Sequence, residues 1–222
     1  MSDAAGTVGG LEPAVRVRAR RVSRRPAGRL STPALVVYAI AVALLVGFGS
    51  AYWALKGEYP VGAVRVGPWL TWPKIGSRDA DPYARAVVAR SGEVPLGVGE
   101  GLAFLASADN AGRALDARCA YQVGSVTPQA RYWTLTIYDA EGRPARTDLG
   151  RSGLTSAEIL RRDDGSFVVE LSRMARPGNW LQLPSSGDFT LVLRLYDTPV
   201  AAGSAALDAR VLPGIERLEC AS

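Results

Sequence analysis

The sequence predicts a mainly β outer domain with one short helix, preceded by a single N-terminal transmembrane helix. Two observations lead to this fold class. The first is an uncharged run from Ala34 to Leu55, which as a helix is long enough to cross a bilayer. The second is a series of short apolar runs beyond Gly101, separated by Asp/Gly turns, which is typical of a β-sandwich or a β-barrel.

Residues 1–33 are predicted to form a disordered basic tail. They hold seven arginines and two acidic residues, whereas the rest of the chain has 19 basic and 19 acidic residues. Positive charge on one side of an apolar run favours the cytoplasm for that side, and the arginine-rich, lysine-poor composition suggests a bacterial source. We therefore expect a transmembrane helix at 34–55 in the inner membrane, a cytoplasmic N-terminus and a periplasmic outer domain. The expected partner of the chain is then the lipid bilayer and not nucleic acid.

Two alternatives for the apolar run stay open. A cleaved secretory signal is one, although the run exceeds the usual apolar region of a signal peptide and no clean small-x-small cleavage site follows it. A buried core helix is the other, although such a helix is seldom apolar on every face. We favour an uncleaved anchor.

Residues 56–78 are predicted to form a juxtamembrane stalk, in which prolines interrupt any helix. Its tryptophans, Trp69 and Trp72, are expected at the lipid headgroups or over an edge of the outer domain. The outer domain is predicted to span residues 79–222. It begins with a helix, "DPYARAVVAR", for which Asp81 is the expected N-cap and Gly92 the expected end.

Two strands of the outer domain, "RYWTLTIY" and "FTLVLRLY", place an apolar residue at every second position, and Val192 is the one aliphatic residue on the opposite face. Trp133, Leu135 and Ile137 are expected to face the core, as are the leucines of the second strand. The opposite face either binds sugar rings or an anionic ligand, or is a plain layer of cross-strand pairs with Arg194 bonded to a carboxylate. The candidate surface residues are Tyr132, Thr134, Thr136, Tyr138, Arg194 and Tyr196.

The chain contains no histidine, which excludes the usual Ser-His-Asp and Cys-His nucleophilic sites and His-based metal centres. A Ser-Lys pair is not favoured, because both lysines lie in the predicted stalk. The adjacent carboxylates at 79/81 and 163/164 are expected to cap a helix and to lead a turn. We therefore expect no cofactor, no metal and no catalytic residue.

The two cysteines, Cys119 and Cys220, are predicted to form a disulfide, because the expected topology places both in an oxidising compartment. Such a bridge closes a loop of about 100 residues, which limits its stabilisation to about 4.7 kcal/mol in the chain-entropy model. Two separate buried thiols are the alternative.

The segments "ADNAGRALDARCAYQV", "RYWTLTIYDAEG", "RRDDGSFVVELS" and "PGNWLQLPSSGDFTLVLRLYDTP" resemble, in this order, the bacterial domain of unknown function 1214 family. The resemblance covers about residues 80–200 and implies a jelly-roll-like antiparallel β-sandwich without an established catalytic residue. Members often have proline where this chain has Gln182, and many carry a companion 1254 domain that this chain is expected to lack. The matching positions are Asp109, Gly112, Trp133, Tyr138, Asp139, Asp164, Gly165, Asn179, Trp180, Leu181, Arg194, Tyr196 and Pro199.

Of these positions, we expect Asp139, Asp164, Gly165, Asn179 and Trp180 to be structural. Asn179 is expected to turn the chain through side-chain to backbone hydrogen bonds, with the ring of the next residue buried against the end of the sandwich.

The favoured function is a non-enzymatic periplasmic module that binds an envelope protein or a glycan. An enzyme that uses a carboxylate and Arg194 in a jelly-roll pocket is the second reading, and a structural anchor subunit of an envelope complex is the third.

Overall fold

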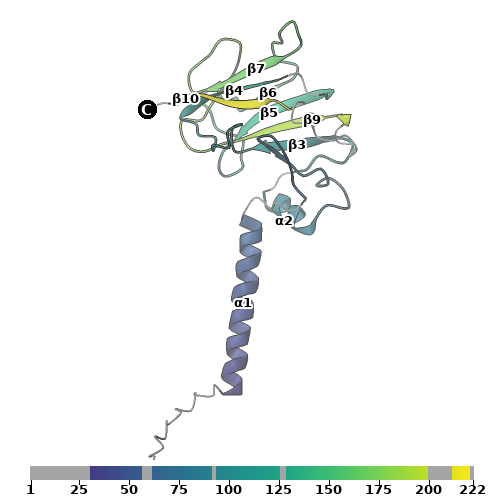
Figure 1. Cartoon of the computed structure of the whole chain (residues 1–222), viewed down its shortest axis with the longest axis vertical. Helices are drawn as coiled ribbons and strands as arrows, with labels where there is room; N and C mark the ends of the chain where they lie inside the picture. The colour runs from purple at the N-terminus through teal and green to yellow at the C-terminus, as the bar shows by residue number, and fades with distance from the viewer. Residues whose placement is uncertain (1–30, 57–61, 92–93, 126–128, 200–211, 221–222) are drawn as a thin grey trace, which may run out of the picture. The chain divides into compact units, whose positions relative to one another are not determined.

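The structure is a computed structural model that describes residues 31–56, 62–91, 94–125, 129–199 and 212–220 (Figure 1). The chain divides into two compact units, Met1–Phe48 and Gly49–Ser222, and we describe each by itself. The predicted basic tail lies outside the described residues except for its last three positions.

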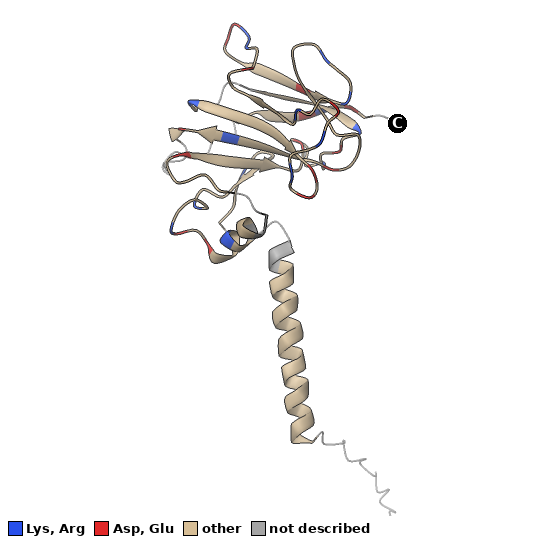
Figure 2. Ribbon diagram, turned by 180° about the vertical axis from the view of Figure 1, so that it is seen from behind, with Lys and Arg blue, Asp and Glu red and all other residues tan. Residues whose placement is uncertain are grey.

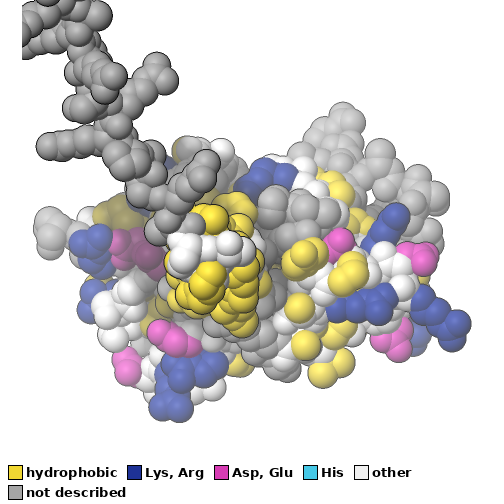
Figure 3. All heavy atoms as spheres, turned by 90° about the horizontal axis from the view of Figure 1, so that it is seen from below, with side chains coloured by type: hydrophobic (Ala, Val, Ile, Leu, Met, Phe, Trp, Pro, Cys, Tyr) yellow, Lys and Arg dark blue, Asp and Glu magenta, His cyan; other side chains and the backbone are white. Residues whose placement is uncertain are grey.

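The first unit contains most of α1, a helix of 25 residues from Thr32 to Lys56. Its segment Thr32–Trp53 has a mean hydropathy of 2.3 and is not buried within the structure. In Figure 2 the part of the helix ribbon that is not grey carries no colour of a charged residue, and in Figure 3 its visible side chains are mainly hydrophobic. A membrane span and an N-terminal signal sequence both have this length and composition.

Among its described residues, the second unit contains ten strands, one short helix and the end of α1, so the mainly β fold class is confirmed. The elements are β1 Val64–Val66, β2 Trp69–Thr71, α2 Pro82–Ser91, β3 Gly101–Ala106, β4 Cys119–Ser125, β5 Tyr132–Tyr138, β6 Gly153–Thr155, β7 Phe167–Ser172, β8 Asn179–Gln182, β9 Thr190–Tyr196 and β10 Gly214–Cys220.

The strands form two sheets. The larger sheet has the order β1-β2-β3-β9-β5-β6 and the smaller has β10-β4-β7-β8. Every described pairing is antiparallel except that of β7 with β8, which is parallel. The expected antiparallel β-sandwich therefore has one parallel pair, whereas the jelly-roll connectivity that the resemblance implies stays a prediction.

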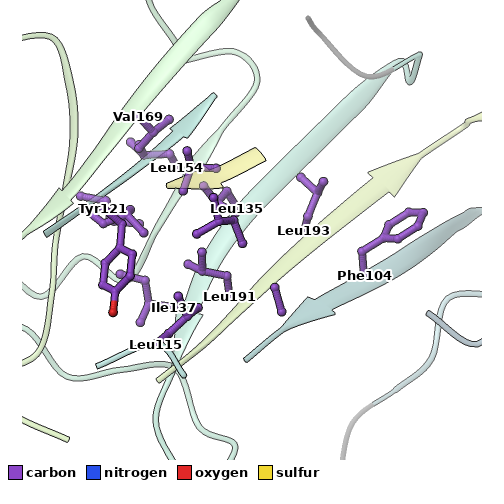
Figure 4. Packing of buried hydrophobic residues seen from close by; sticks show 14 of the residues in the cluster. Phe104, Leu115, Tyr121, Leu135, Ile137, Leu154, Val169, Leu191 and Leu193 are labelled. Carbon is purple, nitrogen blue, oxygen red and sulfur yellow. The ribbon is translucent and has the colours of Figure 1, made fainter. Parts of the chain in front are cut away.

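A single hydrophobic core joins the inner faces of the two sheets (Figure 4). The predicted alternation of β5 and β9 is confirmed, because their inward residues are at most 2% exposed. Aromatic rings meet across the core: Trp133 stacks on Phe167 at 4.8 Å, and Tyr121 meets Phe189 edge-on at 5.6 Å. Each such side chain contributes about 2–3 kcal/mol through removal from water.

A hairpin of β1 and β2 belongs to the larger sheet, because β2 pairs with β3. Trp69 is fully buried, and its indole N–H donates to the carbonyl of Pro213 at 2.7 Å. The stalk interpretation is therefore wrong for residues 64–71. Pro68 lies in the turn beside Gly67, which has a φ of +59°, so it interrupts neither strand.

The helix α2 begins as predicted. Oδ1 of Asp81 accepts hydrogen bonds from the backbone N–H groups of Tyr83 at 2.9 Å and Ala84 at 3.4 Å, which is an N-cap. The expected end at Gly92 lies outside the described residues.

The predicted disulfide is present in the structure, where Cys119 of β4 and Cys220 of β10 are bonded. The two residues are register partners on adjacent strands, so the bridge fastens the last described strand to the middle of the smaller sheet. It joins positions 101 residues apart.

Candidate functional site

The alternation of β5 and β9 places the six candidate residues on the outer face of the larger sheet. The residues between them face the core, and the register pairs Tyr132 with Tyr196 and Thr134 with Arg194. We call this set the β5–β9 surface: Tyr132, Thr134, Thr136, Tyr138, Arg194 and Tyr196.

Two contacts divide the β5–β9 surface. At one end the rings of Tyr132 and Tyr196 are 5.8 Å apart. Toward the other end the guanidinium carbon of Arg194 lies 5.5 Å from the ring centroid of Tyr138, within the range of a cation–π interaction. Arg194 and Tyr138 therefore form one cationic and aromatic unit.

A cavity of about 570 Å³ lies beside this unit. Its floor is the outer face of β3 and β9, and its walls come from α2, residues 72–76, residues 94–98 and the turn after β5. A volume of this size suits a small molecule. Its main apolar lining residues are Trp72, Val88, Leu96, Ala103, Leu105 and Val192.

The cavity takes in only part of the β5–β9 surface. Tyr138 and Arg194 line it, together with the motif residue Asp139, whereas the other four surface residues are absent from its lining. The cavity wall at residues 94–98 was not predicted from the sequence. The apolar run "VPLGV" at 94–98, directly before β3, was the available signal, as was Val192, which is only 4% exposed on the supposedly polar face.

Glycine allows two walls of the cavity to approach each other. A Cβ atom built on Gly76 meets the carbonyl oxygen of Leu96 at 1.9 Å, which is closer than any real contact. The backbone at residue 76 therefore packs directly on the backbone at residue 96, and no larger residue fits there.

Asp139 begins a five-residue turn, and both of its carboxylate oxygens accept hydrogen bonds within this turn. Oδ1 accepts from the backbone N–H groups of Glu141 at 3.1 Å and Arg143 at 2.9 Å, and Oδ2 accepts from Nε of Arg143 at 3.2 Å. The backbone hydrogen bond from Arg143 is the largest cause that lowers the pKa of Asp139. This carboxylate thus stabilises its turn and stays ionised at neutral pH.

The same turn occurs at Asp109, where the carboxylate is almost fully buried. Oδ1 accepts from the N–H groups of Ala111 at 3.0 Å and Arg113 at 2.9 Å, and Nε of Arg113 donates to Oδ2 at 2.8 Å. Nε of Arg217 lies 3.4 Å from Oδ2, within ion-pair distance but without hydrogen-bond geometry. Burial opposes ionisation, but the bonds from Arg113 and Ala111 outweigh it and lower the pKa of Asp109.

The remaining motif residues make structural contacts away from the cavity. Oδ1 of Asp164 accepts from the N–H of Ser166 at 2.9 Å, in a turn where Gly165 has a φ of +78°. Trp180 is half-buried, and its indole N–H donates to Oγ of Ser172 at 3.0 Å. These contacts are consistent with the structural roles expected from the sequence.

Among the residues that the structure describes, no group of three His, Cys, Asp or Glu side chains is arranged to hold a metal ion. The two adjacent carboxylate pairs do not change this. Asp81 is occupied as the helix cap, whereas Asp79 and Asp163 lie exposed on the surface.

The described residues thus combine a β-sandwich, which has a cavity on its outer face, with one long apolar helix. Residues 100–200 match the family described as "Protein of unknown function (DUF1214)". The resemblance seen in the sequence motifs is confirmed over this segment.

Two solved structures are similar to the chain. The VPA0106 protein of Vibrio parahaemolyticus is 20% identical, with a TM-score of 0.55 over 86% of this chain and 46% of that one. An uncharacterized protein of Burkholderia cenocepacia is also 20% identical, with a TM-score of 0.41 over 82% of this chain and 53% of that one. The chain thus spans about half the length of each. A comparison with curated proteins gave no significant match.

Proposed function

We propose that the chain is a single-pass membrane protein whose β-sandwich is a non-enzymatic binding module for an amphipathic small molecule. The cavity of about 570 Å³ on the outer face of the larger sheet is the observation that carries this proposal. A purely structural anchor subunit has no need for a cavity of this kind.

The lining of the cavity indicates the chemistry of its ligand. Most of the lining is aliphatic or aromatic, so an apolar body is removed from water when it enters. Arg194 and Tyr138 lie together at one wall, where a guanidinium group suits a carboxylate, sulfonate or phosphate. An apolar chain or ring with one anionic group fits both features.

The enzymatic alternative also places Arg194 beside a carboxylate, since Asp139 lines the same cavity. However, both oxygens of Asp139 already accept hydrogen bonds within its own turn. Its pKa is lowered, which is the wrong direction for a general acid at neutral pH. Binding is therefore favoured over acid–base catalysis.

For the location, we propose that α1 is an uncleaved anchor in the bacterial inner membrane, with a cytoplasmic N-terminus and a periplasmic sandwich. The one-sided arginines before α1 support this orientation. The disulfide between Cys119 and Cys220 supports an oxidising compartment for the sandwich. An amphipathic ligand is then available from the bilayer or from the envelope.

Photolabelling of the full-length protein in detergent tests the proposed function. The probe is decanoate with a diazirine at the end of its chain, and crosslinked peptides are mapped by mass spectrometry. We expect labels in β3 and in residues 94–98. The variant Ala103→Phe fills the cavity floor and should remove these labels, whereas Thr136→Leu, on the same face but outside the cavity lining, should leave them unchanged. Labels confined to α1, or labels in β3 that survive Ala103→Phe, would contradict the proposal.

A further inference from the structure

The smaller sheet has an outer face of its own, on the other side of the sandwich from the cavity. Its register joins Glu216 of β10 to Gln122 of β4, then to Glu170 of β7 and to Trp180 of β8. These four side chains form one row across all four strands, which we call the outer row. The inner-face neighbour of each is buried: Ile215, Val123, Leu171 and Leu181.

A hollow of about 380 Å³ lies at the β10–β4 end of the outer row. Gly124 and Gly214 are register partners there, so neither strand contributes a side chain at that position. The lining also includes Gln122, Glu216 and Arg162. A shallow site of this kind brings an amide, a carboxylate and a guanidinium group around one small space.

Polar groups of the hollow lack partners in the described chain. Gln122 and Glu216 make no side-chain hydrogen bond or ion pair with any residue that the structure describes. The hydroxyl oxygen of Ser166, also in the lining, is buried without a hydrogen-bond partner among those residues. Buried polar groups in native proteins are nearly always satisfied, so the Ser166 hydroxyl points to a ligand that bonds it there. Gln122 is half-buried and Glu216 is exposed, so their amide and carboxylate are open to the same ligand.

Trp180 provides an aromatic surface at the other end of the outer row. Its indole N–H donates to the carbonyl of Ser172 at 3.2 Å and to Oγ of the same residue at 3.0 Å. The ring is therefore held in one orientation against β7 while part of it stays exposed. A fixed, half-exposed ring suits stacking against an apolar face of a ligand.

Charge decides between ligand classes for this face. Arg162 lines the hollow together with Glu216. Oε2 of Glu170 lies 3.9 Å from Nε of Arg176, which also pairs with Glu219. The surface thus carries both carboxylates and guanidinium groups, which disfavours both a polyanion and a cationic peptide. A neutral ligand that combines hydroxyl groups with a C–H face fits better.

We propose that the outer row and the hollow form a second site, which binds a short chain of neutral pyranose rings. One ring lies in the hollow, where its hydroxyl groups bond Gln122 and Glu216, and a later ring stacks on Trp180. The row crosses three inter-strand spacings, about 14 Å in all, which suits an oligosaccharide and exceeds a single sugar. This site is independent of the cavity and does not rest on the proposed function.

Equilibrium binding of two probes, cellotetraose and the tetramer of N-acetylglucosamine, tests the second site. The full-length protein is kept in a detergent without sugar groups. We expect at least one probe to bind, and Gln122→Ala to weaken its binding about tenfold. Because Gln122 makes no side-chain bond in the described chain, this truncation leaves the fold intact. Trp180→Phe should retain most of the affinity, whereas Trp180→Ala should lose it.

Thr134→Ala, on the larger sheet, is the control and should bind the oligosaccharide like the unmodified chain. The proposal is wrong if neither tetramer binds, or if Gln122→Ala binds as tightly as the unmodified chain. It is also wrong if tetralysine binds in their place. Decanoate labelling of the cavity should be the same in all these variants, so failure of the second site is distinguishable from failure of the proposed function.

Discussion

Asn179 holds Leu160 through both ends of its side-chain amide: the N–H of Leu160 donates to Oδ1 at 2.7 Å, and Nδ2 donates to the carbonyl of Leu160 at 2.8 Å. Nδ2 also donates to the carbonyl of Val168 at 2.9 Å. The segment after β6 is thereby fastened to β7 and β8. Side-chain to backbone bonds were expected of Asn179, but they join distant segments and do not shape a local turn.

Asn179→Ala should lower the free energy of unfolding by about 1–3 kcal/mol, because it leaves two backbone groups of Leu160 without these partners. Amide hydrogen exchange at Leu160 should become faster. Gln182→Ala, on the same strand, is the matched control. It removes one exposed bond, from the N–H of Leu149 at 3.1 Å, so its effect on stability should be smaller. Equal effects of the two variants would argue against a fastening role for Asn179.

Asp109 predicts a pH dependence of stability. Since the pKa of Asp109 is lower in the folded chain than its ordinary value, ionisation stabilises the fold above the unfolded pKa of about 3.9. This contribution is lost as the pH falls through the folded pKa. Asp109→Asn should cost about 1–2 kcal/mol at neutral pH and should flatten the fall in stability below about pH 4.

Asp139→Asn is the control for the pH experiment, because it changes the same type of turn at a more exposed carboxylate. The side chain of Asp139 is 24% exposed, against 1% for Asp109. Denaturant titrations at a series of pH values should show a smaller change for Asp139→Asn. An unchanged pH profile in Asp109→Asn would show that this buried carboxylate does not control acid stability.

The disulfide should stabilise the sandwich as a single unit. Cys220→Ser is expected to cost about 2–4 kcal/mol, because it releases a closed loop in the unfolded chain. The double variant with Cys119→Ser should cost little more than either single variant, since both remove the same bridge. Alkylation of protein isolated from the envelope, before and after reduction, shows whether the thiols are bonded. Alkylation of both thiols without reduction would rule out the bridge in cells.

The proposed orientation of the chain rests on its arginines. A reporter that requires the periplasm should be active when fused after Ser222 and inactive when fused at Ser2. Replacement of the seven arginines in residues 16–29 by glutamine should reduce this bias without changing the outer domain, because all seven lie before it in the sequence. Activity of the reporter at Ser2 would reverse the proposed orientation, and loss of the first 55 residues from the mature protein would identify a signal sequence.

The inward and outward faces of β5 and β9 were predictable from sequence because each strand is seven residues long and alternates, except that Val192 of β9 is buried on the outward face. The hairpin of β1 and β2 was not, because each strand has only three residues and Pro68 lies between them. Three residues give too few alternations to indicate a strand. Tertiary contacts hold β1 and β2 in the sheet, namely the pairing of β2 with β3 and the burial of Trp69.

The candidate site was predictable only where it lies on strands. Tyr138 and Arg194 were identified from their faces, but the cavity beside them depends on residues 72–76 and 94–98, which belong to no strand or helix. The approach of Gly76 to Leu96 joins these two segments, and no periodic pattern reports such a contact. The outer row was not predicted for a related reason. Its four residues become neighbours only through the pairing register of four strands, which the sequence pattern does not show.

Competition is the most direct measurement of ligand binding in the cavity. Photolabelling of β3 by the diazirine decanoate is repeated with increasing unlabelled decanoate, and with decanol as the uncharged competitor. A true site should give saturable suppression by decanoate, weaker suppression by decanol, and a difference between the two that disappears in Arg194→Gln. Labelling of β3 that neither compound suppresses would mean that the probe partitions non-specifically, and would contradict a binding site on the outer face of the larger sheet.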